Sequence, residues 1–120
     1  MSDIQQANIP ARTVTLLAVG GRSTTVTGSA VTGLAAAKQL VMQLDVTTAS
    51  GTSPTLDVVV QDTVDGSNWN TIATFAQATG VTREVIRLTT AFTDQLRVVG
   101  TIAGTTPVFI FGVLAWADSN

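Results

Sequence analysis

The side chains best suited to chemistry in this chain lie in one short turn, Asp65-Gly66-Ser67-Asn68-Trp69. An indole ring is a flat platform on which a sugar could stack, and Asp65 and Asn68 could donate or accept hydrogen bonds beside it. The same residues also suit a tight turn without a ligand, because Gly accepts a positive φ and Asx side chains bond their own backbone. Asp65, Asn68 and Trp69 therefore form a candidate ligand-facing turn, for which the purely structural interpretation is favoured.

Carboxylates are the other candidates for chemistry. Asp45, Asp57 and Asp62 could work as acid and base, but paired glycosidase carboxylates need an aromatic-lined cleft and the chain has only two Trp and four Phe. A calcium site from Asp62, Asp65 and a loop carbonyl would lack the dense Asp/Asn/Gly spacing of a calcium loop. Solvated strand faces explain these aspartates, so we expect no catalytic residue and no metal site.

The residue types that are missing exclude several functions. The chain has no His and no Cys, which rules out a nucleophile–imidazole pair, a thiolate, a conventional zinc site and any disulfide. Its net charge is −2 and its six basic residues are scattered, whereas nucleic-acid binding needs clustered positive charge. The N-terminus lacks a secretory pattern, and the longest apolar run, 108–117, is half a membrane span. We therefore expect that the protein is not an enzyme, that it needs no cofactor, and that neither nucleic acid nor a membrane is its partner.

The elements that position these side chains are predicted to be strands, because Thr and Val are abundant and apolar residues alternate with polar ones. A Gly-Thr-x-Pro phrase occurs at 51–54 and again at 104–107, each time between two alternating segments, which predicts two β-hairpins. The result is an all-β fold, an antiparallel β-sandwich or jelly roll of about eight strands. The expected strands are 13–19, a weak edge strand in 23–31, 40–46, 55–60, 70–75, 82–88, 95–102 and 108–116.

The last strand is apolar on both faces. Phe109 and Phe111 are expected in the core, yet Ile110, Leu114 and Trp116 occupy the opposite face. Each large apolar side chain left in water forfeits about 1.5–3 kcal/mol of burial, so something is expected to cover them. The cover is either the chain's own extended arm, residues 1–11 ahead of a single domain at 12–120, or another copy or larger assembly, which is favoured. The predicted protein-interaction residues are Ile4, Ile9, Pro10, Arg12, Ile110, Leu114 and Trp116.

The stretch from Leu44 to Val58, together with the turn at 65–69, resembles small β-sandwich structural proteins of tailed bacteriophages. Residues 96–98 and 104–109 have the matching character, so the resemblance covers about 40–116 and leaves 1–39 outside it. It implies a non-enzymatic virion protein that decorates or cements the capsid surface, binds the major capsid protein and itself as a homotrimer, and is assembled in the host cytoplasm. The alternatives are a neck or tail component and a carbohydrate-binding module that uses Trp69.

Overall fold

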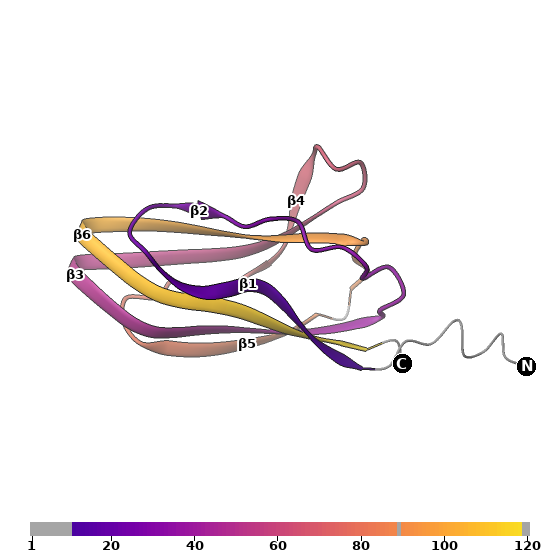
Figure 1. Cartoon of the computed structure of the whole chain (residues 1–120), viewed down its shortest axis with the longest axis horizontal. Helices are drawn as coiled ribbons and strands as arrows, with labels where there is room; N and C mark the ends of the chain where they lie inside the picture. Colours follow the sequence, from indigo (N-terminus) through magenta and orange to yellow (C-terminus); the bar gives the residue numbers. More distant parts are fainter. Residues whose placement is uncertain (1–10, 89, 119–120) are drawn as a thin grey trace, which may run out of the picture.

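Every regular element in the computed structural model, which describes residues 11–88 and 90–118, is a β-strand (Figure 1). All the strands pair antiparallel within one sheet, which confirms the prediction of an all-β antiparallel fold. The described part of the chain holds no helix, and so none long and apolar enough to cross a membrane. The strands are β1 (Arg12–Arg22), β2 (Val26–Thr27), β3 (Gln39–Thr63), β4 (Trp69–Thr74), β5 (Thr82–Leu88) and β6 (Gln95–Asp118).

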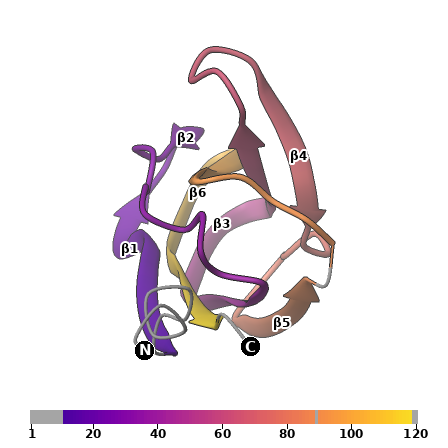
Figure 2. The same ribbon diagram turned by 90° about the vertical axis from the view of Figure 1, so that its right-hand side faces the viewer.

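Two long strands form the centre of the fold. β3 and β6 pair along their whole length, from Gln39 opposite Asp118 to Thr63 opposite Gln95. Both bend near the middle, so that the ladder doubles over and its two halves face each other (Figure 1). We call 39–50 with 108–118 the first limb, which β1 and β5 flank, and 55–63 with 95–103 the second limb, which β2 and β4 flank. Figure 2 shows β2 and β4 towards the top and β1 and β5 towards the bottom.

The two Gly-Thr-x-Pro copies lie at these bends, and the prediction that each closes a hairpin is wrong. The residues before and after each copy belong to one strand and pair with the other long strand, as in Ser50 opposite Val108 and Thr55 opposite Ala103. Among the described residues there are consequently six strands, where about eight were expected. Two pairs of expected strands are continuous: 40–46 with 55–60 in β3, and 95–102 with 108–116 in β6.

Close packing between the two copies explains the glycine in each. Gly51 has a φ of 108° and Gly104 a φ of 124°, a conformation that other residues rarely adopt. A Cβ on Gly51 would lie 2.6 Å from the carbonyl oxygen of Thr106, and a Cβ on Gly104 would lie 2.9 Å from that of Ser53. Each glycine thus lets its strand touch the backbone of the other strand, and the repeated sequence produces a repeated bend.

The inner faces of the two limbs enclose one apolar core. Every second residue from Leu40 to Val46 and from Leu56 to Val60 is fully buried, as the alternation predicts. Phe109 and Phe111 are the largest of the fully buried side chains. Because side chains alternate along a strand, the residues between these core positions point away from the core, and the same pattern determines the composition of the outer faces.

Three local predictions need correction. β1 continues through Gly20-Gly21 to Arg22, three residues beyond the expected end at residue 19. Only Val26–Thr27 forms a strand within 23–31. Asp62 was expected to be solvated but is 8% exposed, and its Oδ2 accepts a hydrogen bond from the Thr93 amide at 3.1 Å that offsets the lost hydration. The prediction of an N-terminal arm falls outside the described residues, apart from Ala11.

Candidate interaction surface

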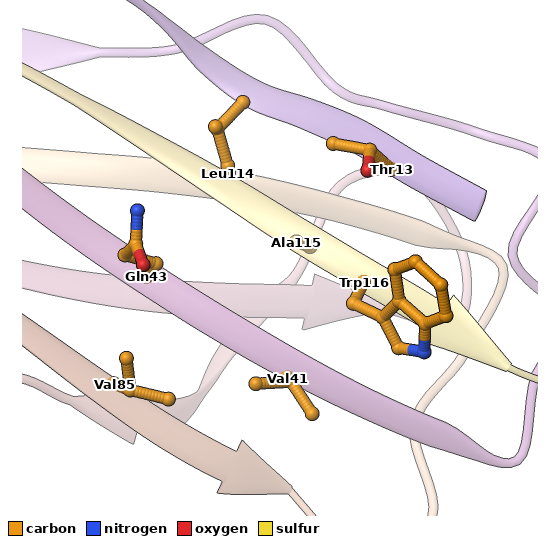
Figure 3. A pocket seen from close by; sticks show the side chains of 7 residues that line it. All are labelled: Thr13, Val41, Gln43, Val85, Leu114, Ala115 and Trp116. Carbon is orange, nitrogen blue, oxygen red and sulfur yellow. The ribbon is translucent and has the colours of Figure 1, made fainter. Parts of the chain in front are cut away.

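The outer face of the first limb carries a shallow, open hollow of about 190 Å³ (Figure 3). It lies across four neighbouring strands in the order β1, β6, β3, β5. Hydrogen-bonded strands therefore hold it, and no loop contributes a lining residue. We call it the outer hollow, and its lining residues are Thr13, Val41, Gln43, Val85, Leu114, Ala115 and Trp116.

Strand pairing brings these residues together in two rows across the face. Each row crosses three inter-strand spacings, about 14 Å. The first row, from β1 to β5, is Thr13, Trp116, Val41 and Arg87. The second row is Thr15, Leu114, Gln43 and Val85.

Large apolar side chains in the hollow remain partly in water. Trp116 is 49% exposed, Leu114 40% and Val85 39%. At about 25 cal/mol per Å² of apolar surface, a half-exposed side chain of this size leaves about 1 kcal/mol of burial unused. Gathered in one hollow, these side chains form an apolar patch whose covering by another group would be favourable.

The rim of the hollow is basic along β5. Arg83 and Arg87 flank Val85 on this strand. The Nη2 of Arg83 lies 3.5 Å from the Oδ2 of Asp45, and because both side chains are well hydrated this ion pair adds little stability. Arg87 is exposed and has no hydrogen bond or ion pair within the described ranges. The face therefore suits a partner that brings an apolar side chain together with a carboxylate.

The structure brings two of the predicted interaction residues, Leu114 and Trp116, into the hollow. Ile110 is half-buried farther along β6, opposite Gly21 of β1. Arg12 lies at the start of β1, where its guanidinium donates a hydrogen bond at 3.0 Å to the carbonyl of Gly33, in the segment between β2 and β3. The remaining three lie outside the described residues: Ile4, Ile9 and Pro10.

Val41, Gln43 and Val85 belong to the hollow but were not among the predicted interaction residues. The sequence does contain a signal for them. Val41 and Gln43 alternate with the buried residues of their strand and so point outward, and Val85 lies between Arg83 and Arg87. Their gathering depends on the pairing of β3 with β6 and β5 in the first limb. The predicted hairpin would instead have paired 40–46 with 55–60, and with that pairing the three residues would not have been expected to lie together.

The candidate ligand-facing turn uses its polar groups internally. Asp65 Oδ1 accepts hydrogen bonds from the backbone amides of Asn68 and Ser67, both at 2.8 Å, and Oδ2 accepts one from Asn68 Nδ2 at 2.8 Å. These donors, the Asn68 amide foremost, hold the pKa of Asp65 far below its ordinary value of 3.8. Gly66 has a φ of 84°, as expected for the Asp-Gly step. The carboxylate is thus an acceptor that closes the turn.

Trp69 begins β4 on the second limb and is half-buried. The guanidinium of Arg97 lies over its ring at 4.3 Å from the ring centre, a cation–π contact. The Nε of Arg97 also donates a hydrogen bond to Gln61 Oε1 at 2.9 Å. One face of the indole is therefore occupied by Arg97 rather than open to a ligand.

The aspartates considered for catalysis or calcium are held apart by separate partners. Asp45 pairs with Arg83, Asp62 accepts from Thr93, and Asp57 accepts from Gln77 Nε2 at 3.1 and 3.2 Å. Within 11–88 and 90–118 no three His, Cys, Asp or Glu residues are grouped so that they could hold a metal ion. No protein-family model and no curated protein matches this chain. The described surfaces of the molecule are therefore the features from which its function can be inferred.

Proposed function

We propose that this chain is a non-enzymatic structural protein of a tailed-phage virion, which binds the outside of the capsid as a decoration or cement protein. The observation that carries the proposal is the outer hollow, where Trp116 and Leu114 are partly exposed on a hydrogen-bonded sheet. These side chains gain burial when another protein covers them. Attachment to a shell is a function that such a surface can perform without any reacting group.

The rigidity of the frame also supports an attachment role. The outer hollow is built on β1, β6, β3 and β5, and its opposite side is the fully buried core of the first limb. A rigid surface loses little conformational entropy when it binds. A capsid presents the same site many times, so that modest individual contacts combine through avidity if the subunits also associate, as in the homotrimer we propose.

The finer class of the fold belongs to the same proposal. The two limbs lie face to face with the apolar core between them, which supports a β-sandwich in which β3 and β6 contribute to both layers. Sheets of this kind keep their shape without a disulfide when the core is continuous. A structural virion protein needs this property more than it needs a cleft.

The test is to separate phage particles that contain this chain into heads and tails and to quantify the chain by mass spectrometry. We expect it to travel with the heads. Recovery with tails would support the neck or tail alternative, and absence from particles would overturn the proposal.

Variants then locate the attachment surface. Leu114→Asp and Trp116→Ala should weaken binding to purified heads at least about tenfold, the equivalent of about 1.4 kcal/mol. Val64→Asp is the matched control, because Val64 is 85% exposed in the turn before β4 and lies outside the hollow. Equal binding by all three variants would mean that the capsid is bound through another surface.

A further inference from the structure

We propose that the outer edge of β5 binds an extended acidic segment of another protein, which adds to the first limb as a further antiparallel strand. The segment would place a carboxylate opposite each of Arg83 and Arg87 and an apolar side chain opposite Val85. The inference rests on the proposed function, which makes the capsid shell the source of this segment. Three features support it: the backbone of β5, the side chains along it, and the charges that disfavour a second copy.

β5 forms the edge of the first limb on the side opposite β1. It pairs with β3 in a ladder that has no register shift, from Thr82 opposite Val46 to Leu88 opposite Leu40. Over residues 11–88 and 90–118, no hydrogen bond outside this ladder reaches the backbone of β5. An edge strand directs the N–H and C=O groups of every second residue away from its neighbour. β5 therefore offers a regular row of backbone donors and acceptors along its seven residues.

The other edge strands in the described ranges are less suited to strand addition. The ladder of β1 shifts register twice, and Arg22 donates hydrogen bonds to the carbonyls of Ala18 and Gly20 at 2.8 and 3.1 Å. β2 has only two residues, and the pairing of β4 shifts between Val60 and Gln61. An added strand gains affinity from a continuous row of main-chain hydrogen bonds, and β5 offers the longest regular row of the four.

The outward side chains of β5 determine the chemistry of the added strand. Arg83, Val85 and Arg87 alternate along β5 and are all exposed, and Val85 also lines the outer hollow (Figure 3). Arg83 pairs with Asp45 at 3.5 Å between hydrated groups, whereas Arg87 has no ion pair within the described ranges. Glu84 already accepts a backbone hydrogen bond at 2.9 Å. Opposite charges that face each other across antiparallel strands stabilise the pairing, so two carboxylates that flank an apolar side chain suit this edge.

The same arginines disfavour pairing of β5 with β5 of a second copy. The symmetric antiparallel register that uses all seven residues places Val85 opposite Val85 and Arg83 opposite Arg87. Like charges directly opposite each other destabilise such a pair, and charged side chains are a common protection of edge strands against self-association. An acidic segment reverses the sign of both contacts. The β5 edge is therefore suited to an acidic strand from a different protein.

A synthetic peptide tests the β5 edge in the full chain. The probe is acetyl-Thr-Glu-Thr-Val-Thr-Glu-Thr-amide, which places its glutamates opposite Arg83 and Arg87 when it pairs antiparallel with Thr82–Leu88. We expect saturable shifts of the β5 amides in two-dimensional NMR spectra and slower hydrogen exchange at every second one. The same peptide with lysine in place of glutamate should bind at least about tenfold more weakly. Binding that leaves the β5 amides unchanged would overturn the proposal, as would the absence of binding.

Methylated peptides separate strand addition from attraction between charges alone. One version of the probe carries N-methyl groups on its odd residues and the other on its even residues, so that each blocks the amides along one edge. Only one edge of the peptide can pair with β5, so one version should lose binding and the other should keep it. Equal binding by the two versions would overturn strand addition.

Arg87→Gln should weaken binding of the glutamate peptide about two- to fivefold, the size expected for an exposed ion pair. Val64→Asp is the matched control, because it changes the net charge by the same amount at a residue that is 85% exposed in the turn before β4. It should leave binding unchanged. Equal weakening by both variants would mean that the peptide senses only net charge, and would overturn the proposal.

Head binding separates this inference from the proposed function. Arg83→Glu combined with Arg87→Glu should weaken attachment to purified heads at least about tenfold, and its preference for the lysine peptide over the glutamate peptide shows that it is folded. Normal attachment by this variant, with attachment lost in Leu114→Asp, would overturn the inference and leave the proposed function intact. If the natural chain does not attach to heads, the proposed function fails, and the peptide measurements alone decide whether β5 accepts an acidic strand.

Discussion

The two limbs share a bent, two-stranded frame but differ in how they treat a tryptophan. Trp69 on the second limb is half-buried, with Arg97 stacked 4.3 Å from its ring centre. Trp116 on the first limb is 49% exposed and has no cation over its ring in the part of the chain that the structure describes. Arg87 is the arginine in the same cross-strand row as Trp116. It pairs with Val41 of β3, so that β3 separates it from Trp116. The Trp69 ring thus takes part in a network of contacts within the chain, whereas the Trp116 ring remains accessible for contact with another molecule.

The repeated phrase makes the comparison sharper. Counted from the proline of each Gly-Thr-x-Pro copy, Gln61 on the second limb has the position that Leu114 has on the first. Gln61 accepts a hydrogen bond from Arg97 and donates one to Thr71 Oγ1 at 3.4 Å, while Leu114 is 40% exposed. The same frame thus presents a self-contained polar network on one outer face and an apolar contact surface on the other.

The largest effect is expected at the bends, which hold the two faces in place. Gly51→Ala would place a Cβ 2.6 Å from the Thr106 carbonyl oxygen and 2.8 Å from Pro107 Cα, at a φ of 108°. Because these are backbone atoms, they cannot move aside cheaply. We expect the free energy of unfolding to fall by about 2–4 kcal/mol, measured by urea denaturation.

Gly80→Ala is the matched control for the bend. Nothing lies within 4 Å of a Cβ built on Gly80, so its free energy of unfolding should change by less than about 0.5 kcal/mol. If Gly51→Ala unfolds at the same urea concentration as the control, the two Gly-Thr-x-Pro copies do not pack against each other as described.

Local patterns predicted which way side chains point but not which segments pair. Alternation from Leu40 to Val46 and around Phe109 correctly assigned inner and outer faces, and with them the exposure of Trp116. Gly and Pro suit both a hairpin turn and a bend, and only the contact with a distant copy decides between them. For that reason Val85 could not be assigned to the hollow, since its neighbours there come from other parts of the chain.

Replacing each tryptophan by alanine should lower the free energy of unfolding by a different amount. Trp69→Ala should lower the free energy of unfolding by about 2 kcal/mol, because burial and the Arg97 contact are both lost. Trp116→Ala should lower it by about 1 kcal/mol or less, because half of the ring already meets water. Equal losses in urea denaturation would mean that Trp116 is as well supported as Trp69.

A pair of arginine variants isolates the stacking contact. Arg97→Gln removes the cation over Trp69 and the hydrogen bond to Gln61, so the free energy of unfolding should fall by about 1 kcal/mol. Arg87→Gln on the exposed β5 should change it by less than about 0.5 kcal/mol. A double-mutant cycle between Arg97 and Trp69 gives the coupling directly. A coupling near zero would remove the contrast between the two rings.

The smallest effect is expected in the turn that precedes Trp69, and it depends on pH. The folded pKa of Asp65 lies below its ordinary value of 3.8, because the amides of Asn68 and Ser67 and the Asn68 side chain donate to the carboxylate. The unfolded chain therefore takes up this proton at a higher pH than the folded chain does. Its contribution to stability is complete above about pH 4 and is lost as the pH falls from there towards the folded pKa.

Asp65→Asn should make the acid side of the stability curve less steep, as measured by urea denaturation at a series of pH values from neutral down to the acid limit. Ser67→Ala is the control, because Ser67 donates through its backbone amide and should keep the natural slope. If Asp65→Asn and the natural chain lose stability in parallel, the turn does not hold its carboxylate in solution. Asp65 and Asn68 would then be free to face a ligand, and the contrast would rest on the Arg97–Trp69 contact alone.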